Sequence, residues 1–450
     1  MLLGTILLTS AGMISRILGF FYRIFLSRTI GASGLGLYQL IFPVFTLCLA
    51  ISASGIQTAI SRFVASSEHP KRYLFCGLFL ATGLAGLFSI SIYMLAPWIA
   101  NDILKEPRTA DLLRIMVFSL IPASIHACFN GYYYGKKESL VPSACQIIEQ
   151  LARVFGTYLI YMVLTEQGRT LEPIHAVWGL VISELAGLLV NLTAYLFRKE
   201  QPDDTSDPFY YIEHRSNVVK SGFSGLVIRC GITAKSLGLL AIPLTLNHIF
   251  VTLSHSLENL LLPQQLVAFG YSSDEALAHF GVLSGMALSV IFFPSAITNS
   301  LSVLLLPRIS ETKAKGDMNI VLDTIKGAVC CGIALGSLCT FVFLFSSDWF
   351  GSVIFDNALA GFYIRTLSIL CPFMYTAILL SSIVNGLGHA GLTLVCNLIG
   401  CAIRIFTIWY LVPVYGMYAY IISMIVAAVI VTIELFLVIK IKCLTTVENI

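Results

Sequence analysis

The sequence has little charge for its length. Of 450 residues, 27 are Lys or Arg and 24 are Asp or Glu, so only 11% are charged, against about 25% in a soluble globular domain. That composition excludes an ordinary water-exposed surface. Apolar residues take the place of charge: 57% of the chain is hydrophobic, and apolar runs of about 20 residues recur, the length that spans a bilayer core. We therefore expect an all-α polytopic membrane protein.

Motifs for catalysis and metal binding are also missing. The twelve cysteines include no CxxC pair and no Cys/His spacing suited to zinc, and they read as small buried hydrophobes. No glycine-rich phosphate loop, HExxH or GxSxG motif occurs. The longest polar segment, 198–217, is short for a catalytic domain. We expect no enzyme activity, metal, cofactor or nucleic-acid partner.

Long apolar segments without period-2 alternation predict transmembrane α-helices. Between charged or turn-rich breaks they give twelve spans, at 3–28, 36–63, 73–99, 111–134, 140–164, 174–197, 233–262, 276–306, 320–346, 361–387, 391–411 and 416–439. One alternate set of loops carries fifteen Lys and Arg residues and the other set carries five. By the positive-inside rule both termini are predicted to be cytoplasmic, which agrees with an even number of spans.

The polar segment 198–217 divides six spans from six. We therefore expect a six-helix bundle at 1–197, a cytoplasmic linker at 198–217 and a second six-helix bundle at 218–450. An even number of spans in each half means that both halves enter the membrane from the same side. The predicted relation is a parallel pseudo-two-fold repeat about the membrane normal.

Two segments carry the repeat. In each, an amide follows a glycine by eleven residues and an arginine follows it by eighteen, and a proline precedes the glycine by thirteen or fourteen; the residues are Pro122, Gly135, Gln146 and Arg153, and again Pro372, Gly386, Asn397 and Arg404. Spans two and eight also end alike, with Arg62 and Arg308 at the cytoplasmic mouth. Pro43 and Pro294 are predicted to interrupt these two spans.

The first span contains three arginines. Arg28 lies near its outer end, where it is expected to reach the membrane interface, whereas Arg16 and Arg23 are seven residues apart and about 20° from alignment on a helix. A charge at the bilayer centre costs about 2.5–3.5 kcal/mol and usually faces a partner or a wet cavity. One interpretation pairs Arg16 with an acid, the choices being Glu149, Glu184, Glu258 or Glu434. The other, which we favour because the span carries no acid, places both guanidinium groups in a cavity that binds phosphate oxygens.

Other charged residues in the predicted spans can likewise form an ion pair or face a cavity. Lys235 either reaches the cytoplasmic edge or lines the cavity, and Arg404 has no local acid, so both are candidate diphosphate-binding residues. Glu149 and Arg153 are four residues apart on one predicted helix and are expected to pair. The candidate ion-pair or gate residues are Arg62, Glu149, Arg153 and Glu258.

Four stretches together resemble the oligosaccharidyl-lipid and polysaccharide flippases, in particular their stage V sporulation protein B-like branch. They are SRILGFFYRIFLSRTIGASGLGLYQLIFPVF, GYYYGKKESLVPSACQIIEQLARV, HFGVLSGMALSV and SLSVLLLPRIS. The family is related to the lipid II flippases and the multidrug and toxin extrusion transporters. The resemblance implies two bundles in a V around a central cavity.

The resemblance also implies a function. It implies a bacterial cytoplasmic membrane protein that exports a polyprenyl-diphosphate saccharide for cell-wall, spore-cortex or surface polysaccharide synthesis by alternating access. Its partners would be this substrate, membrane lipids and cell-wall synthesis enzymes. The alternatives are a cation-coupled exporter of drugs or small amphiphiles, whose cavity should carry carboxylates, and a non-transporting scaffold for cell-wall assembly.

Overall fold

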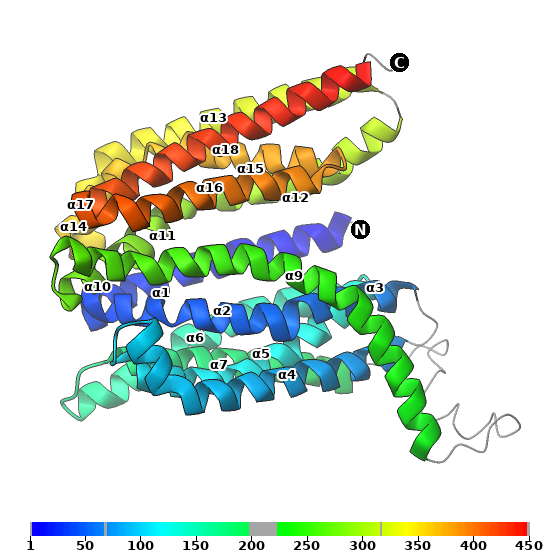
Figure 1. Cartoon of the computed structure of the whole chain (residues 1–450), viewed down its shortest axis with the longest axis horizontal. Coiled ribbons are helices and arrows are strands. Elements are labelled where there is room, and N and C mark those ends of the chain that lie inside the picture. Colours follow the sequence, from blue (N-terminus) through cyan, green and yellow to red (C-terminus); the bar gives the residue numbers. More distant parts are fainter. Residues whose placement is uncertain (1, 67–69, 198–222, 316, 448–450) are drawn as a thin grey trace, which may run out of the picture. The chain divides into compact units, whose positions relative to one another are not determined.

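The computed structural model describes residues 2–66, 70–197, 223–315 and 317–447, and all the regular elements in these ranges are helices (Figure 1). The elements of the first part of the chain are α1 (Leu2–Leu40), α2 (Phe42–Leu49), η1 (Ala50–Ser54, a π-helix), α3 (Gly55–Ser66), α4 (Pro70–Trp98), η2 (Ile99–Ile103), α5 (Thr109–Gly135), α6 (Leu140–Glu166) and α7 (Pro173–Leu196). Those that follow are α9 (Phe223–Phe269), α10 (Ser273–Gly281), η4 (Val282–Ala287), α11 (Leu288–Phe292), α12 (Ser295–Ala314), α13 (Met318–Trp349), η5 (Phe350–Ile354), α14 (Ala358–Leu367), α15 (Leu370–Gly386), α16 (Ala390–Tyr410), α17 (Val412–Tyr415) and α18 (Met417–Val447).

Nine stretches of the described chain are long and apolar enough to span a membrane, and the bent pair α14–α15 makes a tenth. One of the nine, Leu7–Ser66, has 60 residues, or about 90 Å of helix at 1.5 Å per residue, which is enough for the first two expected spans. The seventh expected span lies in α9. The predicted all-helical membrane fold is confirmed, and the twelve expected ranges fall on helical residues apart from short breaks and end residues, such as 293–294 and 368–369.

Helix breaks occur where the sequence places special residues. Gly31 interrupts α1 with φ 72°, a backbone conformation that favours glycine. Pro43 lies in the first turn of α2, and Pro294 precedes α12. The predicted interruptions of spans two and eight are therefore confirmed, since a new helix begins at each of these prolines, which lack the N–H that would extend the preceding helix.

The first compact unit consists of Met1–Leu18 and Ile41–Ser256. Within it α5 packs against α3, α4 and α7, and α6 packs against α7 (Figure 1). Its apolar core draws on α3, α4, α5 and α9, and includes Ile56, Ile60, Leu74, Phe129 and Tyr132.

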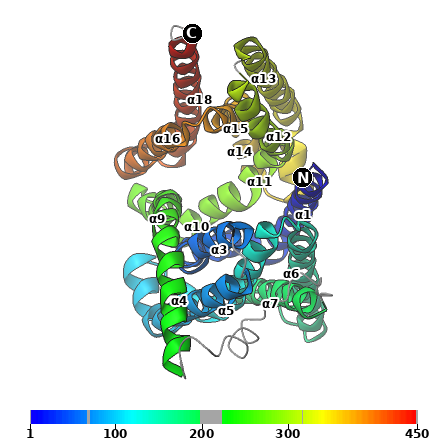
Figure 2. The same ribbon diagram turned by 90° about the vertical axis from the view of Figure 1, so that its right-hand side faces the viewer.

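The second compact unit consists of Gly19–Leu40 and Leu257–Ile450. Here α15 packs against α12, α13 and α18, and α16 packs against α18 (Figure 2). Its core includes Ile309, Val321, Leu379, Ile383 and Leu435. The expected linker at 198–217 lies outside the described residues. The bundle boundaries at 197 and 218, and the V shape, stay predictions.

The two repeated segments make matching contacts in their own units. A Cβ atom added to Gly135 would lie 2.6 Å from the carbonyl oxygen of Ser61 in α3, and one added to Gly386 would lie 2.9 Å from that of Leu306 in α12. Small residues at helix contacts let backbones approach this closely. The structural equivalence of the two hairpins supports the repeat seen in the spacing.

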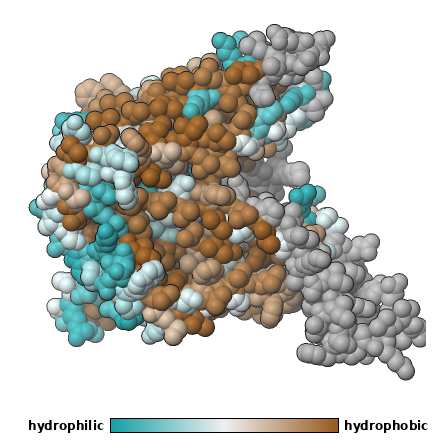
Figure 3. Space-filling model, in the orientation of Figure 1, coloured by the Kyte–Doolittle hydropathy of each residue, from teal (hydrophilic) through white to brown (hydrophobic). Residues whose placement is uncertain are grey.

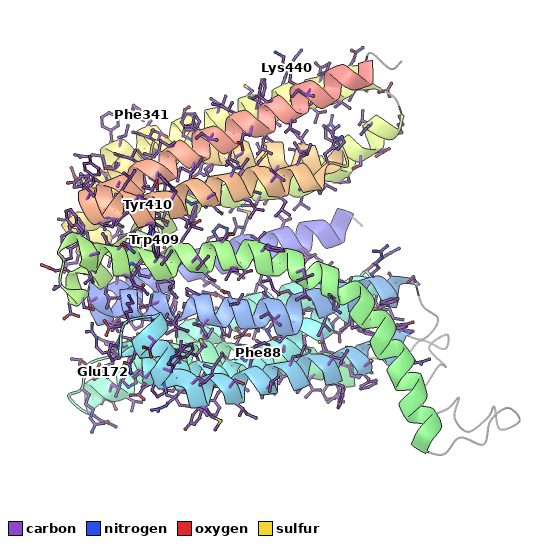
Figure 4. The ribbon with its side chains drawn as sticks, viewed as in Figure 1. Phe88, Glu172, Phe341, Trp409, Tyr410 and Lys440 are labelled. Atoms are coloured by element: carbon purple, nitrogen blue, oxygen red, sulfur yellow. The ribbon has the colours of Figure 1, made fainter. Side chains whose placement is uncertain are left out.

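Large apolar side chains cover much of the surface in view (Figure 3), as expected for helices that face lipid tails. In the second unit, Phe341 of α13 projects outward and is 62% exposed, while Trp409 and Tyr410 lie near one end of α16 (Figure 4). Lys440 lies near the C-terminal end of α18, away from Trp409 and Tyr410 (Figure 4). Aromatic residues at one edge and a lysine at the other are typical of membrane interfaces.

Candidate functional site

Polar side chains run along one face of α3 and the π-helical turn before it. Ser54, Gln57, Thr58 and Ser61 recur at spacings of three and four residues, so they share a face. The opposite face carries Ile56, Ala59, Ile60 and Val64, which are buried in the core of the first unit. We call the four residues the polar face of α3.

The polar face of α3 lines a cavity of about 430 Å³ together with Tyr134 of α5 and His248 of α9. All six lining residues are polar, and none is Asp, Glu, Lys or Arg. Hydroxyl, amide and imidazole groups offer donors and acceptors for hydrogen bonds. Such a lining suits a neutral polyhydroxylated ligand and offers no carboxylate to a cation.

A close approach of α5 to α3 positions Tyr134 at this cavity. A Cβ atom added to Gly131 would lie 2.5 Å from the carbonyl oxygen of Gln57, and Gly135 meets Ser61 in the same way one turn later. The two glycines flank Tyr134 and allow the backbones to touch. The GYYYG stretch, which we used only as a family signature, therefore builds part of the cavity wall.

Arg16 and Arg62 are exposed members of the first unit. Among the described residues of this unit neither has an ion-pair partner or a side-chain hydrogen bond, so the alternative in which Glu149 or Glu184 pairs with Arg16 is not seen there. Ser15, next to Arg16, donates to the carbonyl oxygen of Gln146 at 3.2 Å and ties α1 to α6. Arg62 follows Thr58 by one helical turn, and so extends the polar face of α3 with a positive charge.

Arg23 and Arg28 belong to the second unit. Arg23 donates to the hydroxyl of Ser289 at 2.5 Å. Arg28 donates to the carbonyl oxygens of Val353 and Ile354, where the π-helix η5 ends. Ser289 lies in the HFGVLSGMALSV stretch, so two segments that carried the family resemblance meet through Arg23.

Arg404 has a partner that its local sequence does not reveal. Its Nε and Nη2 atoms donate to the two carboxylate oxygens of Glu258, both at 2.9 Å. The hydroxyl of Tyr420 lies 3.5 Å from the same carboxylate. Two residues that we named for different roles thus form one bidentate ion pair. Diphosphate binding by Arg404 stays a prediction, as does that by Lys235, whose side chain lies outside the described residues.

Glu149 and Arg153 belong to a larger buried cluster in the first unit. His126 Nδ1 lies 3.4 Å from Glu149, and its Nε2 lies 2.8 Å from Glu184. Arg153 lies 3.8 Å from Glu184 and donates to Ser183 at 3.1 Å. We name His126, Glu149, Arg153 and Glu184 the ionic cluster. The local sequence does not single out His126, because its acid partners lie on other helices.

The ionic cluster does not fit a metal centre. His126, Cys145 and Glu149 place donor atoms within 4.8 Å of one another. However, the Cys145 thiol already donates to Glu149 at 2.9 Å, and the fixed positive charge of Arg153 opposes a cation. We assign no metal to this cluster.

A second cavity, of about 520 Å³, lies in the second unit between α12, α13 and α15. Most of its lining is apolar, with Arg308, Asp323 and Thr324 as the polar exceptions. Arg308 was predicted to be the counterpart of Arg62. The two units therefore place a cavity beside equivalent helices, one polar in lining and the other largely apolar.

Comparisons with known proteins agree with this architecture. Residues 1–260 match the model of a family described as polysaccharide biosynthesis protein. Stage V sporulation protein B of Bacillus subtilis (strain 168) is 26% identical over 408 residues, which are 89% of this chain and 76% of that protein.

Two solved structures share the fold. The lipid II flippase MurJ in an inward closed conformation has a TM-score of 0.69 at 15% identity, covering 97% of this chain and 87% of that one. An inward-facing multidrug resistance MATE family transporter of the MOP superfamily has a TM-score of 0.67 at 14% identity, covering 97% and 96%. The family resemblance and the two-lobed fold predicted from the sequence are confirmed.

Proposed function

Because the chain belongs to the polysaccharide biosynthesis protein family, we propose that it is a membrane flippase for a lipid-linked saccharide. The substrate class is a polyprenyl diphosphate that carries a short sugar chain for cell-wall, spore-cortex or surface polysaccharide synthesis. The relative named stage V sporulation protein B and the fold shared with a lipid II flippase support this class.

The observation that carries the proposal is the hydrogen-bonding cavity beside the polar face of α3, whose lining residues include no Asp, Glu, Lys or Arg. A sugar presents several hydroxyl groups, and each must exchange its water for a protein partner when it enters a membrane. Gln57, Thr58 and Ser61 supply such partners from α3, and Tyr134 supplies another from α5. We assign the saccharide to this cavity.

The anionic diphosphate needs cations. Arg16 and Arg62 are exposed and fork-shaped guanidinium groups match phosphate oxygens. We propose Arg16 and Arg23 as the main diphosphate contacts, with Lys235 and Arg404 as further candidates, and Arg62 at the cytoplasmic mouth. The prenyl chain stays in the lipid while the head group crosses by alternating access. The termini are proposed to be cytoplasmic, in a bacterial cytoplasmic membrane.

A reconstituted assay tests this proposal. Vesicles containing the purified protein and a fluorescent polyprenyl-diphosphate disaccharide are treated with a membrane-impermeant quencher, and the rate at which inner-leaflet probe becomes quenched is measured. We expect fast flipping by the wild type, and at least a tenfold loss in Arg16→Ala and Arg23→Ala, since a charged hydrogen bond contributes about 1.5–3 kcal/mol. Full activity of both variants at normal expression would refute the arginine assignment.

The same vesicles separate the alternatives. A cation-coupled drug exporter should flip no probe and should instead extrude a cationic dye, for which the cavity of the first unit offers no lining carboxylate. A scaffold should move neither compound. A lining without carboxylates therefore favours the saccharide over a cationic drug.

A further inference from the structure

The ionic cluster holds four ionisable side chains where a membrane protein rarely keeps one. Glu149, Arg153, Glu184 and His126 come from α5, α6 and α7, and their side chains are only 10–22% exposed. Ionisable groups inside membrane-spanning helices are costly to bury and are usually functional. The saccharide cavity and the arginine contacts leave this cluster without a role.

Counting charges shows that the cluster is balanced by a single proton. Two carboxylates and one guanidinium leave a net charge of −1, because arginine does not release its proton. One proton, on His126 or on a carboxylate, brings the buried set to zero. A neutral cluster avoids the large cost of burying a net charge, and one proton therefore separates its two states.

The geometry around His126 favours that proton on the imidazole. Nε2 lies 2.8 Å from Glu184 and Nδ1 lies 3.4 Å from Glu149. A neutral imidazole has one nitrogen without hydrogen, which would face a carboxylate lone pair, whereas the imidazolium donates from both nitrogens. Moving the proton to Glu149 or releasing it would break this arrangement, so the three groups titrate as one unit.

A polar path leads from the cluster to the saccharide cavity. His126, Asn130 and Tyr134 are four residues apart on α5 and share a face. Asn130 Nδ2 lies 3.4 Å from His126 Nδ1, and its Oδ1 is buried without a hydrogen-bond partner among the described residues. Since a carboxamide can present either atom, Asn130 can donate to an unprotonated Nδ1 or, when turned, accept from a protonated one.

Tyr134 completes the path. It lies within electrostatic range of Glu149 and Cys145, and it also lines the saccharide cavity. A change in the charge of the cluster therefore acts on a side chain that contacts the proposed substrate. This is the physical requirement for coupling between two sites.

We propose that the ionic cluster is a proton-binding site, which takes up and releases one proton in each transport cycle and couples export to the proton gradient. The inference rests on the proposed flippase function and supplies its driving force. Among the described residues, the charged and titratable groups around His126 are Glu149, Arg153 and Cys145 from α6, Glu184 from α7 and Tyr134 from α5.

The test compares flipping of the fluorescent polyprenyl-diphosphate disaccharide with and without an imposed difference of about 1 pH unit, which is a tenfold difference in proton activity. Valinomycin and equal potassium hold the membrane potential at zero. We expect the gradient to stimulate the wild type several-fold, up to about tenfold, and to leave Glu149→Gln unstimulated. Glu434→Gln is the matched control, because it also removes a membrane carboxylate that has a buried oxygen, and it should keep the stimulation.

A second measurement does not depend on transport. Potentiometric titration of the detergent-purified protein between pH 5 and 8 should show that the wild type binds one more proton than Glu149→Gln, with both proteins verified as folded by gel filtration. Equal proton uptake would overturn the proposal whether or not the probe is flipped. Flipping that does not respond to the pH gradient, or that is lost when choline replaces Na⁺, would overturn the proton site but not the flippase function. If neither the wild type nor the variants flip the probe, but the wild type still binds one more proton than Glu149→Gln, the flippase function is refuted and the proton site is supported.

Discussion

The Arg404–Glu258 pair allows a prediction whose magnitude follows from its burial. The two side chains are 18% and 6% exposed, and breaking such a pair by removing one partner costs about 3–5 kcal/mol, mainly because a buried charge loses its compensation. Replacing both partners with apolar residues of similar size is often nearly neutral. We therefore expect Arg404→Met to be strongly destabilising and the double variant Arg404→Met with Glu258→Met to recover most of the loss.

The single variant should also depend on pH, with a definite sign. In Arg404→Met the remaining glutamate avoids a buried charge by binding a proton in the folded state, while the unfolded chain keeps an ordinary glutamate of pKa about 4.3. At 1.36 kcal/mol per pH unit, that proton costs about 3.7 kcal/mol at pH 7 and about 1 kcal/mol at pH 5. The folded state then binds more protons than the unfolded state, so the variant loses stability as pH rises.

The assay is reversible unfolding in mixed micelles with increasing SDS, followed by circular dichroism at pH 5 and pH 7. The penalty of Arg404→Met should shrink by about 2.7 kcal/mol between pH 7 and pH 5, and the double variant should show no such change. Equal penalties at both pH values, or a double variant as unstable as the sum of the single ones, would refute the ion-pair reasoning. A stable double variant that cannot flip the probe would instead favour the diphosphate-binding role predicted for Arg404.

Three further predictions use other parts of the structure. Gly281→Ala should lower the yield of folded protein, because its Cβ atom would lie 2.2 Å from the carbonyl oxygen of Ala32, whereas Gly327→Ala, with no atom within 4 Å of the added Cβ, should leave gel-filtration profiles unchanged. Gln57→Leu should slow flipping about tenfold, since one unsatisfied hydrogen bond costs about 1–3 kcal/mol, and Thr46→Val outside the cavity should not; equal rates would remove the polar face of α3 from the site. Engineered cysteines that crosslink the external ends of the first and seventh expected spans (3–28 and 233–262) should stop flipping if the expected bundles 1–197 and 218–450 rock against each other, so normal flipping with the crosslink complete would exclude that rocking.

Local features of the sequence determined the helices of this protein and where they break. Apolar length predicts a membrane span because the bilayer core has a fixed thickness, and proline at positions 43 and 294 starts a new helix because it cannot donate to the preceding turn. The spacing of the two hairpins predicted the repeat, and Gly135 and Gly386 indeed touch equivalent helices. These inferences rest on residues close in sequence, which is why one chain suffices for them.

Tertiary structure alone decided the partners of the buried charges and the wall of the cavity. Arg404 lies 146 residues from Glu258 in the sequence, and several membrane glutamates could equally have taken that place. The role of His126 becomes visible only in the structure, where α6 and α7 place Glu149 and Glu184 next to its two ring nitrogens. A sequence states which charges must be compensated inside a membrane, but the choice of partner depends on how helices pack, and packing is set by many contacts between distant residues.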